Sequence, residues 1–250
     1  MTTREDVVSF VNDYLQISAV PDSSLNGLQV EGRDTVRKIV FGVSAGLELF
    51  KKAKAAGADM IIVHHGLLWG KEQALIGAFG RRVAFLLQNQ ISLLGYHLPL
   101  DKHPKIGHNA LLLKSLKAKN IRPFASYHGQ EIGFWGQIKP QSLKSVVSQL
   151  EHTCQAQALT LDFGEKKISK VGVVSGGGWS MLPDAINLGL DLFVTGSVDE
   201  PVQEMCREGR INCAALGHYN SEKIGVLALM KKVQSRFQVE VEFIDIKNPL

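Results

Sequence analysis

Apolar residues along the chain follow a helical spacing first and then a rhythm of short strands and helices. Between residues 3 and 16, Val7, Val11 and Leu15 recur at helical spacing, which predicts an amphipathic first helix. After a loop, the run "KIVFGV" predicts a strand, "LELFKKAKAAG" a helix and "DMIIV" a second strand. The chain therefore begins, after its first helix, with a β-α-β unit.

This alternation continues to about residue 120, ending with a helix over residues 108–119, and resumes from residue 168 to the C-terminus. Strands and helices in such an order are typical of helices covering a mainly parallel sheet. Residues 121–167 interrupt the order with a strand, a helix and a strand. We therefore expect an α/β protein in which residues 1–120 and 168–250 together form one α/β domain. Residues 121–167 are expected to form a small inserted α+β lobe.

The two halves resemble each other in sequence. "GADMIIVHHG" from Gly57 aligns without gaps with "GLDLFVTGSV" from Gly189, and "VSAG" corresponds to "VSGG". "ISLLGYH", which ends at His97, corresponds to "INCAALGH", which ends at His218. An internal duplication follows. In open α/β sheets, ligands lie beyond the carboxyl ends of the strands, so these ends are the place to look for chemistry.

Side chains able to bind metal stand directly after four of the predicted strands. They are His64, His65, His97, Asp101, Asp199, Glu200, His218 and Glu222. His64 and His65 are adjacent, and two consecutive rings can converge only where the strand ends. If a helix begins at Tyr219, His218 and Glu222 face the same point. Imidazoles and carboxylates together suit Zn, Fe, Mn or Ni better than Ca or Mg.

Structural roles compete with several of these assignments. His97 is either a ligand or a histidine at the edge of the core. Asp199 and Glu200 can simply charge the first turn of the next helix, which leaves Glu200 as a candidate at the rim of the site. "SGGGW", residues 175–179, is either a weak phosphate cradle or a tight turn, because it lacks the Lys and Ser/Thr of a P-loop. Solvated positions are expected for the other histidines, which are His103, His108, His128 and His152.

Composition narrows the class of protein. The 250 residues carry a formal charge of +4, and their Lys and Arg residues are scattered, so nucleic acid binding is unsupported. No apolar run reaches the length of a membrane span, and the first residues lack a signal-peptide core, so we expect no membrane association and a cytoplasmic location. Cys154, Cys206 and Cys213 form no Cys-x-x-Cys pair and are expected to be reduced packing thiols.

Six motifs in order resemble one known family over essentially the whole chain. "NGLQVEG", "IIVHHG", "GYHLPLD", "TGSVDE", "GHYNSEKIG" and "FIDIKNP" are similar to those of the GTP cyclohydrolase 1 type 2 homologs, especially the bacterial YbgI-like members. The resemblance implies a two-lobed α/β protein that assembles as a toroidal homohexamer, with two divalent metal ions per subunit.

The resemblance also implies a ligand set. By position it consists of His64, His65, Asp101, His218 and Glu222. Glu222 would bridge both ions, with His65 and Asp101 on one and His64 and His218 on the other. His97 falls on a family histidine close to the site. Ser197 departs from the family, because many relatives carry an acid directly after "TG".

Two ions bridged by one carboxylate would hold a shared water and lower its pKa toward neutrality. We therefore predict a dinuclear metal-dependent hydrolase in which hydroxide attacks a small, nucleotide-type substrate, with His97 and Glu200 as catalytic candidates. The resemblance suggests GTP, whose imidazole ring is opened at C8. A second hypothesis is a metal-binding hexameric ring that serves as a partner-binding or regulatory scaffold without turnover. A third, DNA binding by a ring with a positive lumen, requires a steeply salt-dependent affinity.

Overall fold

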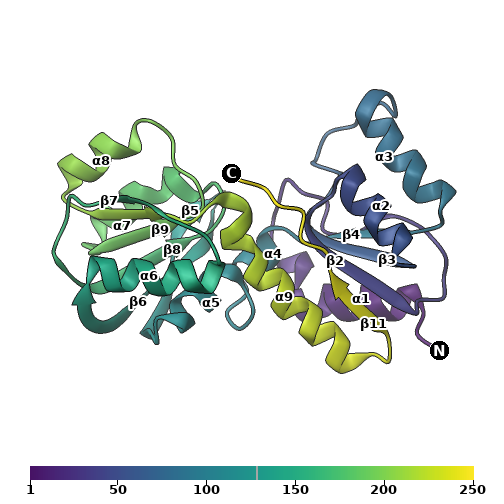
Figure 1. The fold of residues 1–250 in the computed structure, drawn as a ribbon, viewed down its shortest axis with the longest axis horizontal. Helices are drawn as coiled ribbons and strands as arrows, with labels where there is room; N and C mark the ends of the chain where they lie inside the picture. The colour runs from purple at the N-terminus through teal and green to yellow at the C-terminus, as the bar shows by residue number, and fades with distance from the viewer. Residues whose placement is uncertain (128) are drawn as a thin grey trace. The chain divides into compact units, whose positions relative to one another are not determined.

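The computed structural model describes residues 1–127 and 129–250 (Figure 1). The chain divides into two compact units. Unit 1 comprises Met1–Leu100 and Val226–Lys247, and unit 2 comprises Asp101–Gly225 and Asn248–Leu250. Each unit is built around one sheet with helices packed against it, so the predicted mixed α/β class is confirmed. The sheet of unit 1 is mainly parallel, as expected, whereas the sheet of unit 2 has two parallel and three antiparallel strand pairs.

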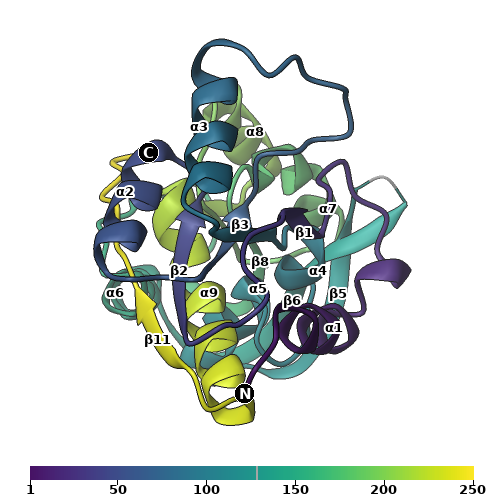
Figure 2. The same ribbon diagram turned by 90° about the vertical axis from the view of Figure 1, so that its right-hand side faces the viewer.

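Unit 1 contains a five-stranded sheet of order β1-β4-β3-β2-β11. Its strands are β1 (Gly27–Val30), β2 (Lys38–Ser44), β3 (Met60–His65), β4 (Ser92–Gly95) and β11 (Glu240–Phe243). All neighbours are parallel except β1, which is antiparallel to β4. The strand β11, yellow in Figure 2, brings the C-terminal segment beside β2. The histidine motifs found in the sequence lie at the carboxyl ends of β3 and β4: His64 and His65 are the last residues of β3, and His97 follows β4.

Helices cover both faces of this sheet (Figure 1). The helices that include residues of unit 1 are α1 (Arg4–Leu15), the 3-10 turn η1 (Ile17–Ala19), α2 (Leu47–Ala55), α3 (Gly77–Gln88), α4 (Leu98–Asp101) and part of α9 (His218–Arg236). The predicted first helix is α1. Thr3 and Asp6 cap it reciprocally, and its apolar stripe, including Val7 and Val11, is buried. On the opposite face of the sheet, Leu49 and Phe50 of α2 join the buried cluster of the strands.

Unit 2 contains a six-stranded sheet of order β5-β6-β8-β9-β10-β7. Its strands are β5 (Lys119–Tyr127), β6 (Gln130–Ser142), β7 (Leu159–Leu161), β8 (Lys167–Val174), β9 (Leu192–Thr195) and β10 (Asn212–Ala215). Its helices are α5 (His108–Ser115), α6 (Leu143–Cys154), η2 (Gly178–Met181), α7 (Leu182–Asn187), α8 (Val202–Gly209) and the start of α9. Figure 1 shows α5 and α6 on one side of the sheet and α7 and α8 on the other.

The two sheets repeat one pattern, as the sequence duplication predicts. Read from the antiparallel edge strand, β1-β4-β3-β2 and β7-β10-β9-β8 have the same order. Asp59 accepts hydrogen bonds from two consecutive backbone N–H groups (2.8 and 3.2 Å), and the aligned Asp191 does the same (2.8 and 2.8 Å). The order along the chain also repeats: helix α6 and strand β7 precede β8, just as α1 and β1 precede β2.

The division of the chain differs from the expected one. Residues 121–167 do not form a compact unit of their own, because β6 and β7 pair with the strands of unit 2. The helix expected over residues 108–119 ends at Ser115, since Lys117 and Asn120 adopt left-handed backbone angles (φ 57° and 53°). The strand β5 that follows was missed. It carries a run of exposed residues and Pro123, which a strand at the edge of a sheet tolerates.

No helix of the described chain is both long and apolar enough to cross a membrane. Cys154, Cys206 and Cys213 are buried and unbridged, as predicted for packing thiols.

Candidate metal centre

Three histidines gather at the carboxyl ends of β3 and β4 in unit 1. His64 is buried, while His65 and His97 are half-buried. One possible ligand atom from each lies within 4.8 Å of those of the other two. The ring centroids of His64 and His65 are 4.5 Å apart, and those of His64 and His97 are 5.1 Å apart. The adjacent pair therefore converges because the strand ends there.

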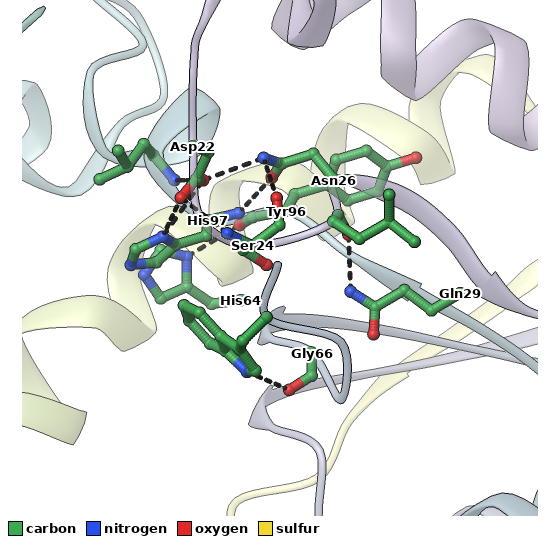
Figure 3. Close-up of polar contacts among 11 residues, drawn as sticks. Asp22, Ser24, Asn26, Gln29, His64, Gly66, Tyr96 and His97 are labelled. Carbon is green, nitrogen blue, oxygen red and sulfur yellow. Dashed lines mark hydrogen bonds and ion pairs between the residues drawn. The ribbon is translucent and has the colours of Figure 1, made fainter. Parts of the chain in front are cut away.

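Each of these rings makes a hydrogen bond through Nδ1. His64 Nδ1 lies 2.8 Å from the carbonyl oxygen of Tyr96, and His97 Nδ1 lies 3.0 Å from Oδ1 of Asp22 (Figure 3). His65 Nδ1 lies 3.1 Å from Oγ of Ser44. Carbonyl and carboxylate oxygens only accept, so Nδ1 carries the proton in His64 and His97. In the neutral rings, Nε2 then keeps the lone pair that a metal ion or a proton requires.

The carboxylate behind His97 belongs to Asp22, a residue that the sequence analysis did not select. Burial alone would raise the pKa of Asp22, but the hydrogen bond and charge of His97 and the bonds from Asn26 and Ser24 outweigh it. These contacts hold the pKa at about 2. The available signal was the polar loop "PDSSLN", whose Asp22 accepts from the backbone of Ser24 in an Asx turn (3.0 Å).

An indole ring stands beside the histidines. The ring centroid of Trp69 lies 5.0 Å from that of His97, nearly edge-on, and 6.2 Å from that of His65. Its Nε1–H donates to the carbonyl oxygen of Gly66 (3.0 Å), which fixes the plane of the ring. Unit 1 thus offers an aromatic surface next to possible ligand nitrogens.

In unit 2, helix α9 begins at His218, one residue earlier than expected, and brings His218 and Glu222 together. The distance from Nε2 of His218 to Oε1 of Glu222 is 3.4 Å. Glu222 is buried, whereas His218 is partly exposed. Gly176, with φ of +63°, lies directly against this pair: a Cβ there would overlap Oε1 of Glu222 and lie 3.2 Å from Nε2 of His218. Glycine is favoured here because the backbone angle is strained for other residues and a Cβ would displace the Glu222 carboxylate.

Asp101, the last residue of α4, is held by Ser175, which is itself fixed by Asn109. Ser175 Oγ donates to Oδ1 of Asp101 (3.1 Å), and the backbone N–H of Ser175 donates to Oδ1 of Asn109 (2.7 Å). Possible ligand atoms of Asp101 and His108 lie within 4.8 Å of each other. Gly225 N–H donates to Nδ1 of His108 (3.1 Å), so the proton of the neutral ring is on Nε2. His108 is therefore suited to donate to a carboxylate rather than to bind an ion.

The burial of His108 corrects the expectation of a solvated histidine. It is completely buried, because the first turn of α5 contacts the middle of α9, a pairing that local sequence does not contain. His103 lies in a loop, where Nδ1 accepts from two backbone N–H groups, and His152 is exposed on α6. His128 lies outside the described residues.

The remaining candidates lie in turns. Asp199 and Glu200 are exposed before α8, where Asp199 Oδ1 accepts from the backbone N–H of Glu200 (2.8 Å). Neither belongs to a group of metal-binding geometry among the residues that the structure covers. "SGGG" forms a tight turn: Gly176 donates its N–H to Oγ of Ser221 (3.0 Å), and its carbonyl accepts from Ser197 N (2.9 Å). These contacts favour the turn over the phosphate cradle.

The His, Asp and Glu side chains described above therefore fall into candidate metal-binding groups. Imidazole nitrogen and carboxylate oxygen without thiolate suit a divalent ion of the Zn, Fe, Mn or Ni type. The lone pairs preset on Nε2 and the glycine that admits Glu222 both fit such an ion.

Comparison with known proteins places the chain among relatives that match it along its length. A protein named "GTP cyclohydrolase 1 type 2 homolog" from Archaeoglobus fulgidus is 42% identical over 246 residues, covering 98% of each chain. The solved structure of "protein ybgI, unknown function" has a TM-score of 0.92 and 35% identity, covering 99% of this chain and 100% of that one. TTHA1606 from Thermus thermophilus has a TM-score of 0.91 and 36% identity over the same shares. The model of the Duf34/NIF3 (NGG1p interacting factor 3) family matches residues 2–249, and the chain belongs to this family.

Proposed function

We propose that this protein is a dinuclear metal-dependent hydrolase. The proposed ligands are His64, His65, Asp101, His218 and Glu222. The observation that carries the proposal is that hydrogen bonds and a glycine already orient these side chains to bind an ion. Nε2 of His64 holds a lone pair because Nδ1 carries the proton and donates it in a hydrogen bond to the carbonyl oxygen of Tyr96. Gly176 leaves room for the Glu222 carboxylate.

The donor set would divide between two ions. We propose that Glu222 would bind both of them, that His65 and Asp101 would complete one site, and that His64 and His218 would complete the other. Two divalent ions so held would supply Lewis acidity and an activated water. The chain supplies orientation, because Ser44 holds the ring of His65 and Ser175 holds the carboxylate of Asp101.

A nucleotide is the proposed substrate class, and GTP is the first candidate because the relatives carry its name. Trp69 supports this class, since its indole beside His65 and His97 offers a surface on which a planar base can stack. His97 is the proposed group that contacts the reacting part of the substrate. Glu200 remains a candidate at the rim.

Metal analysis tests the ligand set. Protein purified without added metal should contain about two divalent ions per chain, as a two-metal site requires. Glu222→Ala should lose most of both ions, whereas Glu131→Ala, which removes an exposed acid of the same unit, should keep them. Undiminished metal in the Glu222 variant would refute the bridging role.

Turnover assays test the reaction. The metal-loaded protein should hydrolyse at least one member of a panel of GTP, other nucleoside triphosphates and bis(p-nitrophenyl) phosphate. Intact metal content with no turnover of any of them would favour the scaffold hypothesis instead. Binding to DNA that falls steeply with salt would favour the third hypothesis.

A further inference from the structure

Three polar side chains of the segment 22–29 form hydrogen bonds with residues that follow strands β3 and β4 (Figure 3). This segment includes most of the "NGLQVEG" motif, to which no metal ligand was assigned. All of its partners described below lie in unit 1.

The first side chain is Asp22, which is only 2% exposed. Its two carboxylate oxygens accept from Nδ1 of His97 (3.0 Å) and from the backbone N–H of Leu98 (2.9 Å). They also accept from the backbone of Ser24 (3.0 Å) and from Nδ2 of Asn26 (2.9 Å). Four donors therefore fix the carboxylate, and the carboxylate in turn fixes the plane of the His97 ring.

The second side chain, Asn26, secures the backbone of the same loop. Its Oδ1 accepts from the backbone N–H of His97 (2.8 Å), while its Nδ2 donates to Asp22 and to the carbonyl oxygen of Ser24 (3.2 Å). Asn26 thus holds both the histidine and the residue that orients it.

The third side chain, Gln29, secures the loop after β3. Its Oε1 accepts from the backbone N–H groups of Leu67 (2.6 Å) and Leu68 (3.3 Å). Its amide lies against Gly66 and Gly95, where a Cβ would overlap it. The glycines of "HHG" and "GYH" therefore make room for Gln29, which links the two strand ends that carry the histidines.

We propose that Asp22 is a positioning residue that holds His97 in its Nδ1-protonated form and presents Nε2 to the substrate, with Asn26 and Gln29 as the frame that keeps this geometry. The proposal rests on the proposed function, because it assumes that a substrate binds beside the histidines. Asp22 itself would touch neither ion nor substrate.

The tautomer of His97 tests the proposal directly, whatever the reaction. In metal-free, ¹⁵N-labelled protein at neutral pH, long-range ¹H–¹⁵N spectra should show the proton of His97 on Nδ1. In Asp22→Asn the carboxamide can donate as well as accept, so the spectra should show a shift toward protonation on Nε2. A proton on Nε2 in the wild-type chain, or identical spectra for both chains, would overturn the proposal.

Metal content and turnover separate this proposal from the proposed function. Asp22→Asn should keep about two ions per chain, but its kcat on bis(p-nitrophenyl) phosphate should fall on the order of a hundredfold with little change in KM. The matched control is Asp59→Asn, which removes another buried carboxylate that accepts backbone N–H groups, at the opposite end of β3. It should lower stability without changing the His97 tautomer. Equal losses of kcat in both variants would show that Asp22 has only a structural role. No turnover by the wild-type protein would refute the proposed hydrolase function, and the spectra alone would then decide the role of Asp22.

Discussion

Replacing Gly176 with alanine should remove metal while changing stability only modestly. The backbone at Gly176 has φ of +63°, which costs an alanine about 1 kcal/mol. The new Cβ would also overlap Oε1 of Glu222. Because that atom is the end of a flexible side chain, the carboxylate should rotate away at a further cost of about 1 kcal/mol. The expected total is about 2 kcal/mol of unfolding free energy, with loss of the proposed bridging ligand.

Gly189 provides a matched control in the same unit. It has nearly the same backbone angle, φ of +61°, but nothing lies within 4 Å of a Cβ built there. Gly189→Ala should therefore lose about 1 kcal/mol and keep its ions. Urea denaturation of the metal-free chains, followed by circular dichroism, measures the first quantity, and elemental analysis after zinc loading measures the second. The reasoning fails if Gly176→Ala retains both ions at wild-type affinity, or if both variants lose metal equally.

Three further predictions concern the pH dependence of stability, the affinity for zinc and the assembly of the chain. The folded-state pKa of Asp22, about 2, lies below the ordinary value of 3.8. Asp22 should therefore stabilise the metal-free protein by about 2 kcal/mol above pH 4 and lose this contribution as the pH falls toward 2. A difference in unfolding free energy between wild type and Asp22→Asn that is the same at pH 7 and pH 2.5 would contradict this. Ser44→Ala removes the hydroxyl beside Nδ1 of His65 and should weaken zinc binding about tenfold in calorimetry, whereas Ser9→Ala, an exposed serine of α1, should not. Light scattering should show the chain as a homohexamer. Ile76→Asp, which replaces a 74% exposed apolar side chain with a charged one, should reduce the assembly. A monomeric wild-type chain would refute the prediction of a hexamer.

The strand and helix rhythm was readable because burial imposes it locally. Strands such as β3 are buried on both faces, so they appear as continuous apolar runs between glycine-closed helices. The duplication could be detected in the sequence for a related reason. Asp59 and Asp191 both accept hydrogen bonds from backbone N–H groups of the neighbouring strand, and they occupy the same position in the alignment of the two halves. The edge strand β5 left little trace, since most of it is exposed and needs no apolar pattern.

The α/β class, the repeat and the gathering of histidines and acids at strand ends could be predicted from the sequence alone, because these features depend on neighbouring residues and on a two- or 3.6-residue period. The side chains that support them could be identified only in the folded chain. Asp22 meets His97 across 75 positions of the chain, and His108 meets Gly225 across 117. Such pairings depend on how distant segments pack, so no local spacing could identify Asp22 as the partner of His97 or remove His108 from the surface.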